Sequence, residues 1–190
     1  ELVRIAQAAG ELHYDESPVW EATLGDLAHE AFAVYHEAQL GLSLADHLEQ
    51  SRLSLEVLLR NLRLADCVDG DWRLTVAGLL MFGADPQRFM PQSRLSAVAF
   101  AGGDEDADIL DRREITGRLP QIITDARLFM ERNIRQPARE LGFQRQDLPL
   151  YDRKALGEAV VNAVAHRDYS LSGSQIRLFV FDDRVEVRSP

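Results

Sequence analysis

Hydrophobic and polar positions change their spacing twice in the last part of the chain. Over residues 158–170, alanines and valines are interrupted by polar residues four positions apart, which is typical of a helix with one polar stripe. Residues 175–181 are apolar at nearly every position, and residues 184–188 alternate between charged and apolar. Asp182 and Asp183 separate the two runs as turn residues. The pattern predicts a helix followed by a β-hairpin with one buried and one half-exposed strand.

The earlier part of the chain shows mainly helical spacing with a few strand-like runs. Residues 1–22 have no sustained period and are interpreted as a tail, and residues 102–108 form an acidic, solvated loop. The other expected elements, in chain order, are helices over 23–41, from 43 and over 54–62, a hairpin around 69–71, a helix over 76–82, a strand over 94–100 and a long helix within 113–134. This mixture predicts an α+β fold in two small units.

The polar stripe of the 158–170 helix offers a specific chemistry. Glu158, Asn162 and His166 share one helix face because they are four residues apart. A carboxylate can orient or deprotonate an attacking water, and an amide oxygen can help hold Mg²⁺ against phosphates. A solvated helix face shows the same spacing, so the stripe alone leaves both interpretations open.

Three segments of the chain resemble one group of bacterial proteins. Glu-x-x-x-Asn followed by a hairpin that turns on Asp-Asp resembles the N-box region of the GHKL ATPases, the gyrase, histidine kinase and MutL group. The longer stretch EAVVNAVAHRDYSLSGSQIRLFVFDDRVEVRSP is similar to the nucleotide-binding part of Schlafen/AlbA-type transcriptional regulators, which are often labelled RecG-related. The stretch LRLADCVDGDWRLTVAGLLMFGADPQRFMPQSRLSAVAFAG resembles their connector, and YDESPVWEATLGDL resembles the end of their AlbA-like DNA-binding domain.

The resemblance implies a domain layout. Residues 1–22 would be the tail of the preceding AlbA-like domain, and residues 23–83 a helical, winged-helix-like connector with a short hairpin. Residues 84–190 would be a partial GHKL-like (Bergerat-like) domain, a two-layer α/β sandwich.

The resemblance also implies roles for five residues. It makes Glu158 the catalytic general base, and Asn162 the magnesium ligand and a nucleotide contact. His166 and Asp168 belong to the His-Arg-Asp-Tyr motif on the nucleotide side. Two roles are open for His166: facing the phosphates, or capping and packing the helix end. The second role is favoured. Ser189 stands where GHKL ATPases carry the aspartate that binds the adenine amino group, and a serine hydroxyl lacks the charge that strengthens such a bond.

Two departures from the family pattern change the expected activity. Ser189-Pro190 replaces the start of the Asp-x-Gly-x-Gly box, and the glycine loops that would wrap the phosphates are absent. The chain also begins without methionine and stops on a strand. We therefore expect a fragment that lacks most of the AlbA-like domain and the glycine-box and lid region. It would not hydrolyse ATP itself, and any ATPase activity would belong to the full-length protein.

Charge and composition narrow the expected partners. The net charge of −10 disfavours this chain as the main nucleic-acid surface, so DNA is expected to bind through the missing N-terminal domain. Lys154 is the only lysine and no Walker A loop precedes it, which excludes the helicase implied by the RecG label. No apolar run approaches the length of a membrane span, and the single cysteine, Cys67, excludes an internal disulfide. A cytoplasmic location without membrane contact is the resulting expectation.

Two functions remain at this stage. The leading one is a segment of an ATP-binding, GHKL-like transcriptional regulator, in which ATP and Mg²⁺ binding is coupled to a linked DNA-binding domain. The alternative is a non-catalytic interaction or homo-oligomerisation module whose nucleotide site has degenerated.

Overall fold

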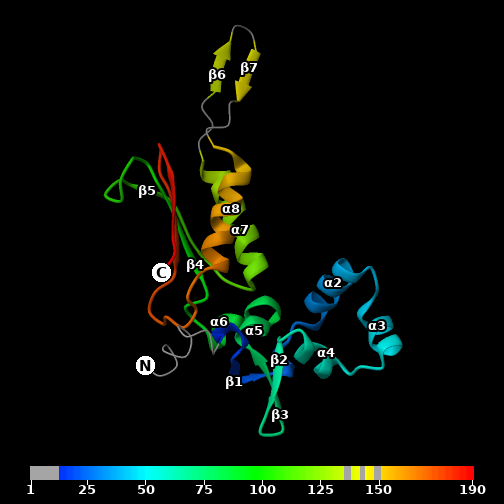
Figure 1. The fold of residues 1–190 in the computed structure, drawn as a ribbon. Coiled ribbons are helices and arrows are strands. Elements are labelled where there is room, and N and C mark those ends of the chain that lie inside the picture. Colours follow the sequence, from blue (N-terminus) through cyan, green and yellow to red (C-terminus); the bar gives the residue numbers. More distant parts are fainter. Residues whose placement is uncertain (1–12, 135–137, 142–143, 148–150) are drawn as a thin grey trace. The chain divides into compact units, whose positions relative to one another are not determined.

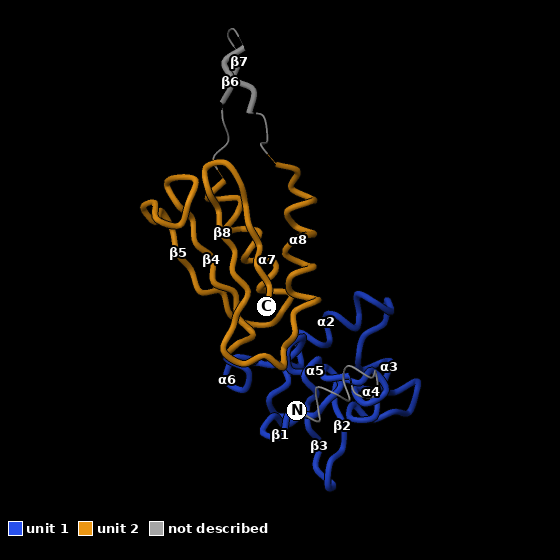
Figure 2. The backbone as a smooth tube through the Cα atoms, turned by 60° about the vertical axis from the view of Figure 1, so that its left-hand side comes forward, with its two compact units in different colours: residues 1–91 blue, residues 92–190 orange. Residues whose placement is uncertain are grey.

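The computed structural model describes residues 13–134, 138–141, 144–147 and 151–190. The fold is α+β, as expected, and divides into two compact units, residues 1–91 and 92–190 (Figure 2). The division falls after Pro91 rather than after residue 83. Helix α6 (Pro86–Phe89) contacts the first unit's strand β1, and Arg88 pairs with Asp26 at 3.6 Å, so residues 84–91 belong to the first unit.

The first unit combines a small antiparallel sheet with four helices that are longer than α6 (Figure 1). The sheet has the strand order β1-β3-β2, with β1 (Pro18–Thr23), β2 (Ala65–Val68) and β3 (Asp71–Thr75). The helices are α2 (His29–Leu40), α3 (Leu44–Ser51), α4 (Leu55–Asn61) and α5 (Val76–Phe82). Helices α3, α4 and α5 each begin with a hydroxyl group that accepts a hydrogen bond from a backbone N–H. These hydroxyl groups belong to Ser43, Ser54 and Thr75. Helices followed by a hairpin are thus in the order predicted for this segment.

Strand β1 departs from the expected tail. Strand β1 begins at Pro18 and pairs with β3, and Ala22 is fully buried, so residues 18–22 belong to the unit's sheet. The pairing is irregular and its partner lies about 50 residues away, which leaves no clean alternation for sequence reasoning to detect. Tyr14–Glu16 forms a 3-10 turn, η1, and residues 1–12 of the expected tail lie outside the described residues.

The start of the first predicted helix is also different. Thr23 forms a capping box with Asp26, but the box opens a short 3-10 turn, η2 (Leu24–Asp26). The α-helix begins only at His29 and ends before Gly41, which adopts the left-handed conformation.

The second unit is a two-layer arrangement of a mixed sheet and two helices (Figure 1). The strand order is β5-β4-β8-β9, with β4 (Leu95–Phe100), β5 (Ile109–Ile115), β8 (Ile176–Val180) and β9 (Val185–Arg188). Strands β4 and β8 are parallel, and the other pairs are antiparallel. Helices α7 (Leu119–Asn133) and α8 (Arg153–Ala165) pack on one face. Strands β6 (Ala138–Leu141) and β7 (Gln144–Asp147) form a separate hairpin.

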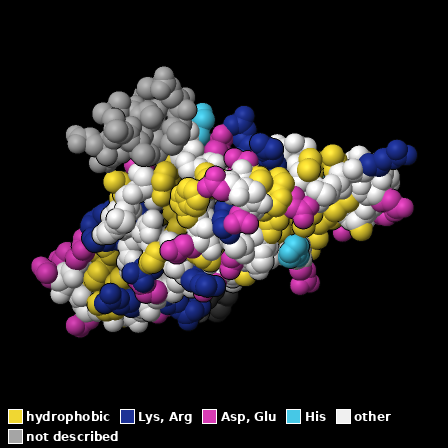
Figure 3. Space-filling model, turned by 90° about the horizontal axis from the view of Figure 1, so that it is seen from below, with side chains coloured by type: hydrophobic (Ala, Val, Ile, Leu, Met, Phe, Trp, Pro, Cys, Tyr) yellow, Lys and Arg dark blue, Asp and Glu magenta, His cyan; other side chains and the backbone are white. Residues whose placement is uncertain are grey.

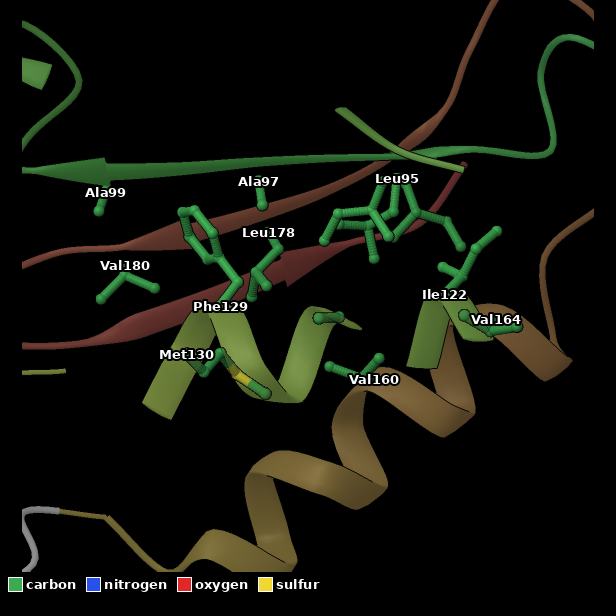
Figure 4. Packing of buried hydrophobic residues seen from close by; sticks show 13 residues of the cluster. Leu95, Ala97, Ala99, Ile122, Phe129, Met130, Val160, Val164, Leu178 and Val180 are labelled. Carbon is green, nitrogen blue, oxygen red and sulfur yellow. The ribbon is translucent and has the colours of Figure 1, made fainter. Parts of the chain in front are cut away.

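The main core of the second unit lies between this sheet and the two helices (Figure 4). Phe129 of α7 and Val160 of α8 are buried there against Leu178 in the middle of the sheet. Strand β5 was not predicted, because most of its residues are exposed and charged. Helix α7 lies within the predicted range 113–134 and has Pro120 in its first turn, as expected.

A second apolar cluster covers part of the other face of the sheet. It consists of Val98, Phe100, Phe179 and Phe181. The guanidinium groups of Arg184 and Arg188 lie over the rings of Phe181 and Phe179, at 4.1 and 4.8 Å from their centres. Arg188 also pairs with Glu105 at 2.8 Å, so the acidic 102–108 loop is tied to the β8–β9 hairpin.

Candidate functional site

Helix α8 has one apolar face and, on its exposed side, residues of the predicted polar stripe. Gly157, Val160 and Val164 are buried, and the last two belong to the core of the unit. Glu158 and Asn162 are exposed on the same helix, one turn apart. The sequence-based placement of these two side chains on one open face is therefore confirmed.

Glu158 makes only a weak local interaction. Its carboxylate lies 3.9 Å from the Lys154 ammonium group one turn earlier, and both side chains are largely exposed. Exposed pairs of this kind contribute about 0.5 kcal/mol or less. The carboxylate thus remains accessible from solvent.

The helix ends earlier than the sequence pattern indicated. Helix α8 stops at Ala165, and His166 occupies the C-cap position with its backbone N–H bonded to the Asn162 carbonyl at 2.9 Å. His166 is exposed in this position. Residues 167–170 follow as a turn rather than as part of the helix.

Arg167 turns inward and organises the segment after the helix. Its side chain is buried, and its Nη2 donates to the carbonyls of Leu171 and Ser174 at 3.1 and 2.6 Å. Its guanidinium group also lies over the ring of Tyr169, 4.9 Å from the centre. Arg167 therefore holds residues 168–174 against the unit.

Tyr169 secures the helix end from the other side. Its hydroxyl donates to the Val164 carbonyl at 2.9 Å, in the last turn where carbonyls lack an intrahelical donor. Burial raises the pKa of Tyr169 to about 12, although the nearby Arg167 partly opposes the shift. Sequence reasoning missed Arg167 and Tyr169 as anchoring residues, since no spacing distinguishes them from the exposed members of the same motif.

Asp168 has a local role in this turn. Its Oδ1 accepts hydrogen bonds from the backbone N–H and the hydroxyl of Ser170, at 3.0 and 2.5 Å. Asp168 is exposed, and its carboxylate stabilises the turn in the manner of an Asx turn.

Ser189 contacts helix α8, although it lies more than 20 residues further along the chain. Its hydroxyl donates to the Ala163 carbonyl at 3.0 Å, immediately beside Asn162 in the sequence. Ala163 is also in the last turn of α8, so this bond satisfies a second terminal carbonyl. The structure therefore brings the end of the hairpin to the turn that carries Asn162.

On the face in Figure 3, basic and acidic side chains are interspersed. Among the residues that the structure describes, no three His, Cys, Asp or Glu side chains are grouped as a metal site.

The chain is similar in fold to a solved structure, and the matches found do not indicate an activity. No curated protein matches the chain. A family model described as "Domain of unknown function (DUF8451)" matches residues 4–96. The crystal structure of the DIP2311 protein from Corynebacterium diphtheriae is similar, with a TM-score of 0.60 and 22% identity. The match covers 98% of this chain and 35% of that one, so this chain spans about a third of its neighbour.

Membrane insertion is not indicated by any described helix. None of the helices in the described part of the chain combines the length and the apolar character that crossing a bilayer requires.

Proposed function

We propose that this chain carries the base and metal side of a GHKL-like nucleotide site, within a transcriptional regulator that couples ATP binding to a linked DNA-binding domain. The observation that carries the proposal is the hydrogen bond from Ser189 to the Ala163 carbonyl. It supports the proposal because Ser189, which the resemblance sets at the position of the adenine-binding aspartate, contacts the turn that bears Asn162. Glu158, Asn162 and Ser189 are all exposed, and Ser189 contacts α8 through the Ala163 carbonyl.

The proposed roles follow from the positions of the side chains. Asn162 supplies an amide oxygen to Mg²⁺ that is also bound by the phosphates. Glu158, one turn earlier and open to solvent, orients or deprotonates the attacking water in the full-length protein. We assign to His166, at the C-cap of α8 one turn beyond Asn162, the contact with a phosphate oxygen.

Asp168 takes a supporting role in the proposal. Its carboxylate is engaged by Ser170, so it shapes the turn after the helix rather than binding the nucleotide directly. The buried Arg167 and the half-buried Tyr169 hold that turn in place, which fixes the end of the helix on which the proposed ligands lie.

Binding of ATP to the full-length protein tests the proposal. Titration with a fluorescent ATP analogue in the presence of Mg²⁺ should show saturable binding that Asn162→Ala reduces at least tenfold, about 1.4 kcal/mol. Asn61→Ala, at the exposed end of α4, is a matched control and should bind as the wild type does. Unchanged affinity of Asn162→Ala would remove the site assignment.

A second variant separates binding from hydrolysis. Glu158→Gln keeps the size and hydrogen-bonding capacity of the side chain but removes its basicity. If the full-length protein hydrolyses ATP, this variant should retain affinity and lose turnover. Loss of affinity with normal turnover per bound nucleotide would contradict the role given to Glu158.

The alternative function is a protein-interaction module with a degenerate nucleotide site. Its supporting observation is the exposed edge of the second unit's sheet. Absence of saturable ATP binding by the full-length protein, together with self-association, would favour it.

A further inference from the structure

Two histidines join α2 to α3 in the first unit. The Nε2 atom of His36 on α2 lies 2.7 Å from the Nδ1 atom of His47 on α3, and the two stacked rings have their centres 4.8 Å apart. His36 is only 4% exposed, and its Nδ1 atom has no hydrogen-bond partner among the described residues. A contact of this length between two ring nitrogens requires one proton, so one imidazole donates and the other accepts.

Helix α3 depends strongly on this contact. None of its residues is buried. The hydroxyl groups of Ser43 and Ser51 form their hydrogen bonds within α3 and its cap. Within the described part of the chain, the bond between His36 and His47 is the one side-chain hydrogen bond that ties α3 to another helix. An element with so little buried surface opens at a low free energy, and a single contact can decide its position.

The number of protons on the two rings decides whether the contact can form. One added proton preserves the bond, because an imidazolium N–H can donate to the ring that is still neutral. A second added proton puts N–H donors on both facing nitrogen atoms and a positive charge on each of the stacked rings. His36 is buried, so solvent screens the repulsion between the two rings poorly.

The surroundings of the pair offer no countercharge. Positions three and four residues from each histidine share its helix face, and they carry no acidic side chain; the residues are Phe32, Ala33, Gln39, Leu40, Ser43, Leu44, Gln50 and Ser51. Helix α5, which packs against α2, has no titratable side chain. The acids nearest in sequence are the exposed Glu37, Asp46 and Glu49, and Asp46 accepts a hydrogen bond from Ser43.

We infer that the pair of His36 and His47 is a pH-sensitive switch, which holds α3 on α2 at neutral pH and releases α3 in acid. The released pair can bind one proton more than the closed pair. Free imidazoles take up protons near about pH 6.5. Each pH unit below this value therefore shifts the ratio of closed to released molecules by up to about tenfold toward release.

Hydrogen exchange of the full chain tests the switch. Mass spectrometry should measure amide exchange at about pH 7.5 and about pH 5, with each rate divided by the intrinsic rate at that pH. Protection of residues 44–51 should fall by about tenfold or more at the lower pH, whereas α5 should keep its protection. Equal protection of α3 at both pH values would overturn the inference. An equal loss in α5 would also overturn it, because the whole unit would then be unfolding.

Substitutions of the histidines assign the effect to the pair. His47→Gln keeps a hydrogen-bonding group opposite His36 but takes up no proton, so the loss of protection in acid should disappear. His29→Gln makes the same change at an exposed histidine of α2 and should respond to pH as the wild type does.

A second substitution covers the case in which His47→Gln is not folded by circular dichroism at neutral pH. His36→Phe replaces the buried imidazole by an apolar ring, and it should also remove the pH response. A response that persists in the folded variants of His36 and His47, or that disappears in His29→Gln, would refute the switch.

Discussion

The hydroxyl of Ser189 donates a hydrogen bond to the Ala163 carbonyl, with the two oxygens 3.0 Å apart. The bond joins the end of β9 to the last turn of α8, where carbonyls have no donor within the helix. The Tyr169 hydroxyl donates a hydrogen bond to the Val164 carbonyl, which also lies in the last turn of α8. One side chain from just beyond β9 and one from the turn directly after the helix thus fix the helix end that carries the proposed ligands.

Ser189→Ala should destabilise the second unit slightly. The lost hydrogen bond is exposed, so the expected decrease in the free energy of unfolding is about 0.5 kcal/mol, at the low end for hydrogen bonds. Urea denaturation measures it, with the exposed Ser172→Ala as the control. A decrease of similar size in both variants would show that the bond contributes nothing particular.

Tyr169→Phe should change the alkaline pH dependence of stability. The folded pKa of about 12 lies above the ordinary value of 10, because burial disfavours the phenolate. The contribution is therefore fully present below pH 10 and is lost as the pH rises toward 12. The free energy of unfolding should fall more steeply over this window in the wild type than in Tyr169→Phe. Tyr35→Phe, in the first unit, serves as the control, and parallel pH profiles of the wild type and Tyr169→Phe would contradict the prediction.

Arg167→Met should loosen the turn after α8. The substitution keeps an unbranched chain of similar length but leaves the carbonyls of Leu171 and Ser174 without their charged donor. We expect a loss of about 2–3 kcal/mol of stability and faster amide exchange over residues 168–174. The exposed Arg177→Met should cost less than about 0.5 kcal/mol. Equal effects of the two substitutions would argue against a structural role for Arg167.

Gly78→Ala should destabilise the first unit in spite of its helical position. In a helix interior the change would normally stabilise by about 1 kcal/mol. At this position the added Cβ would lie 1.9 Å from the Leu64 carbonyl oxygen, so backbone must move. The steric clash should outweigh the gain in helix propensity, so the free energy of unfolding should fall by about 2 kcal/mol or more. Gly25→Ala, whose Cβ would meet only the Thr23 hydroxyl at 3.4 Å, should cost less than about 1 kcal/mol by thermal denaturation, and equal losses would refute the steric explanation.

Elements with a strong local pattern were predicted well from the sequence. The turn at Asp182 and Asp183, the helix over residues 76–82 and the starts of α3 and α4 at Ser43 and Ser54 all agree with the structure. In each case the signal is local, a hydroxyl cap or a change in hydrophobic period.

Elements that depend on distant partners were missed. Strand β1 becomes a strand by pairing with β3, and β5 is a charged edge whose apolar residues do not alternate. The exposure of Glu158 and Asn162 followed from helical spacing, whereas the burial of Arg167 depends on carbonyls that only the folded turn brings together. The catalytic and ligand roles remain predictions from the resemblance.

The parallel pairing of β4 with β8 has a consequence for how the protein is made. Their paired residues are separated by about 80 positions, and loop closure over this length slows folding. During synthesis, all segments of the first unit leave the ribosome well before β8 does. Strand β4, whose six residues are all buried in the folded unit, is meanwhile without its central partner. We therefore expect β4 to be a principal site of chaperone binding and of aggregation during expression.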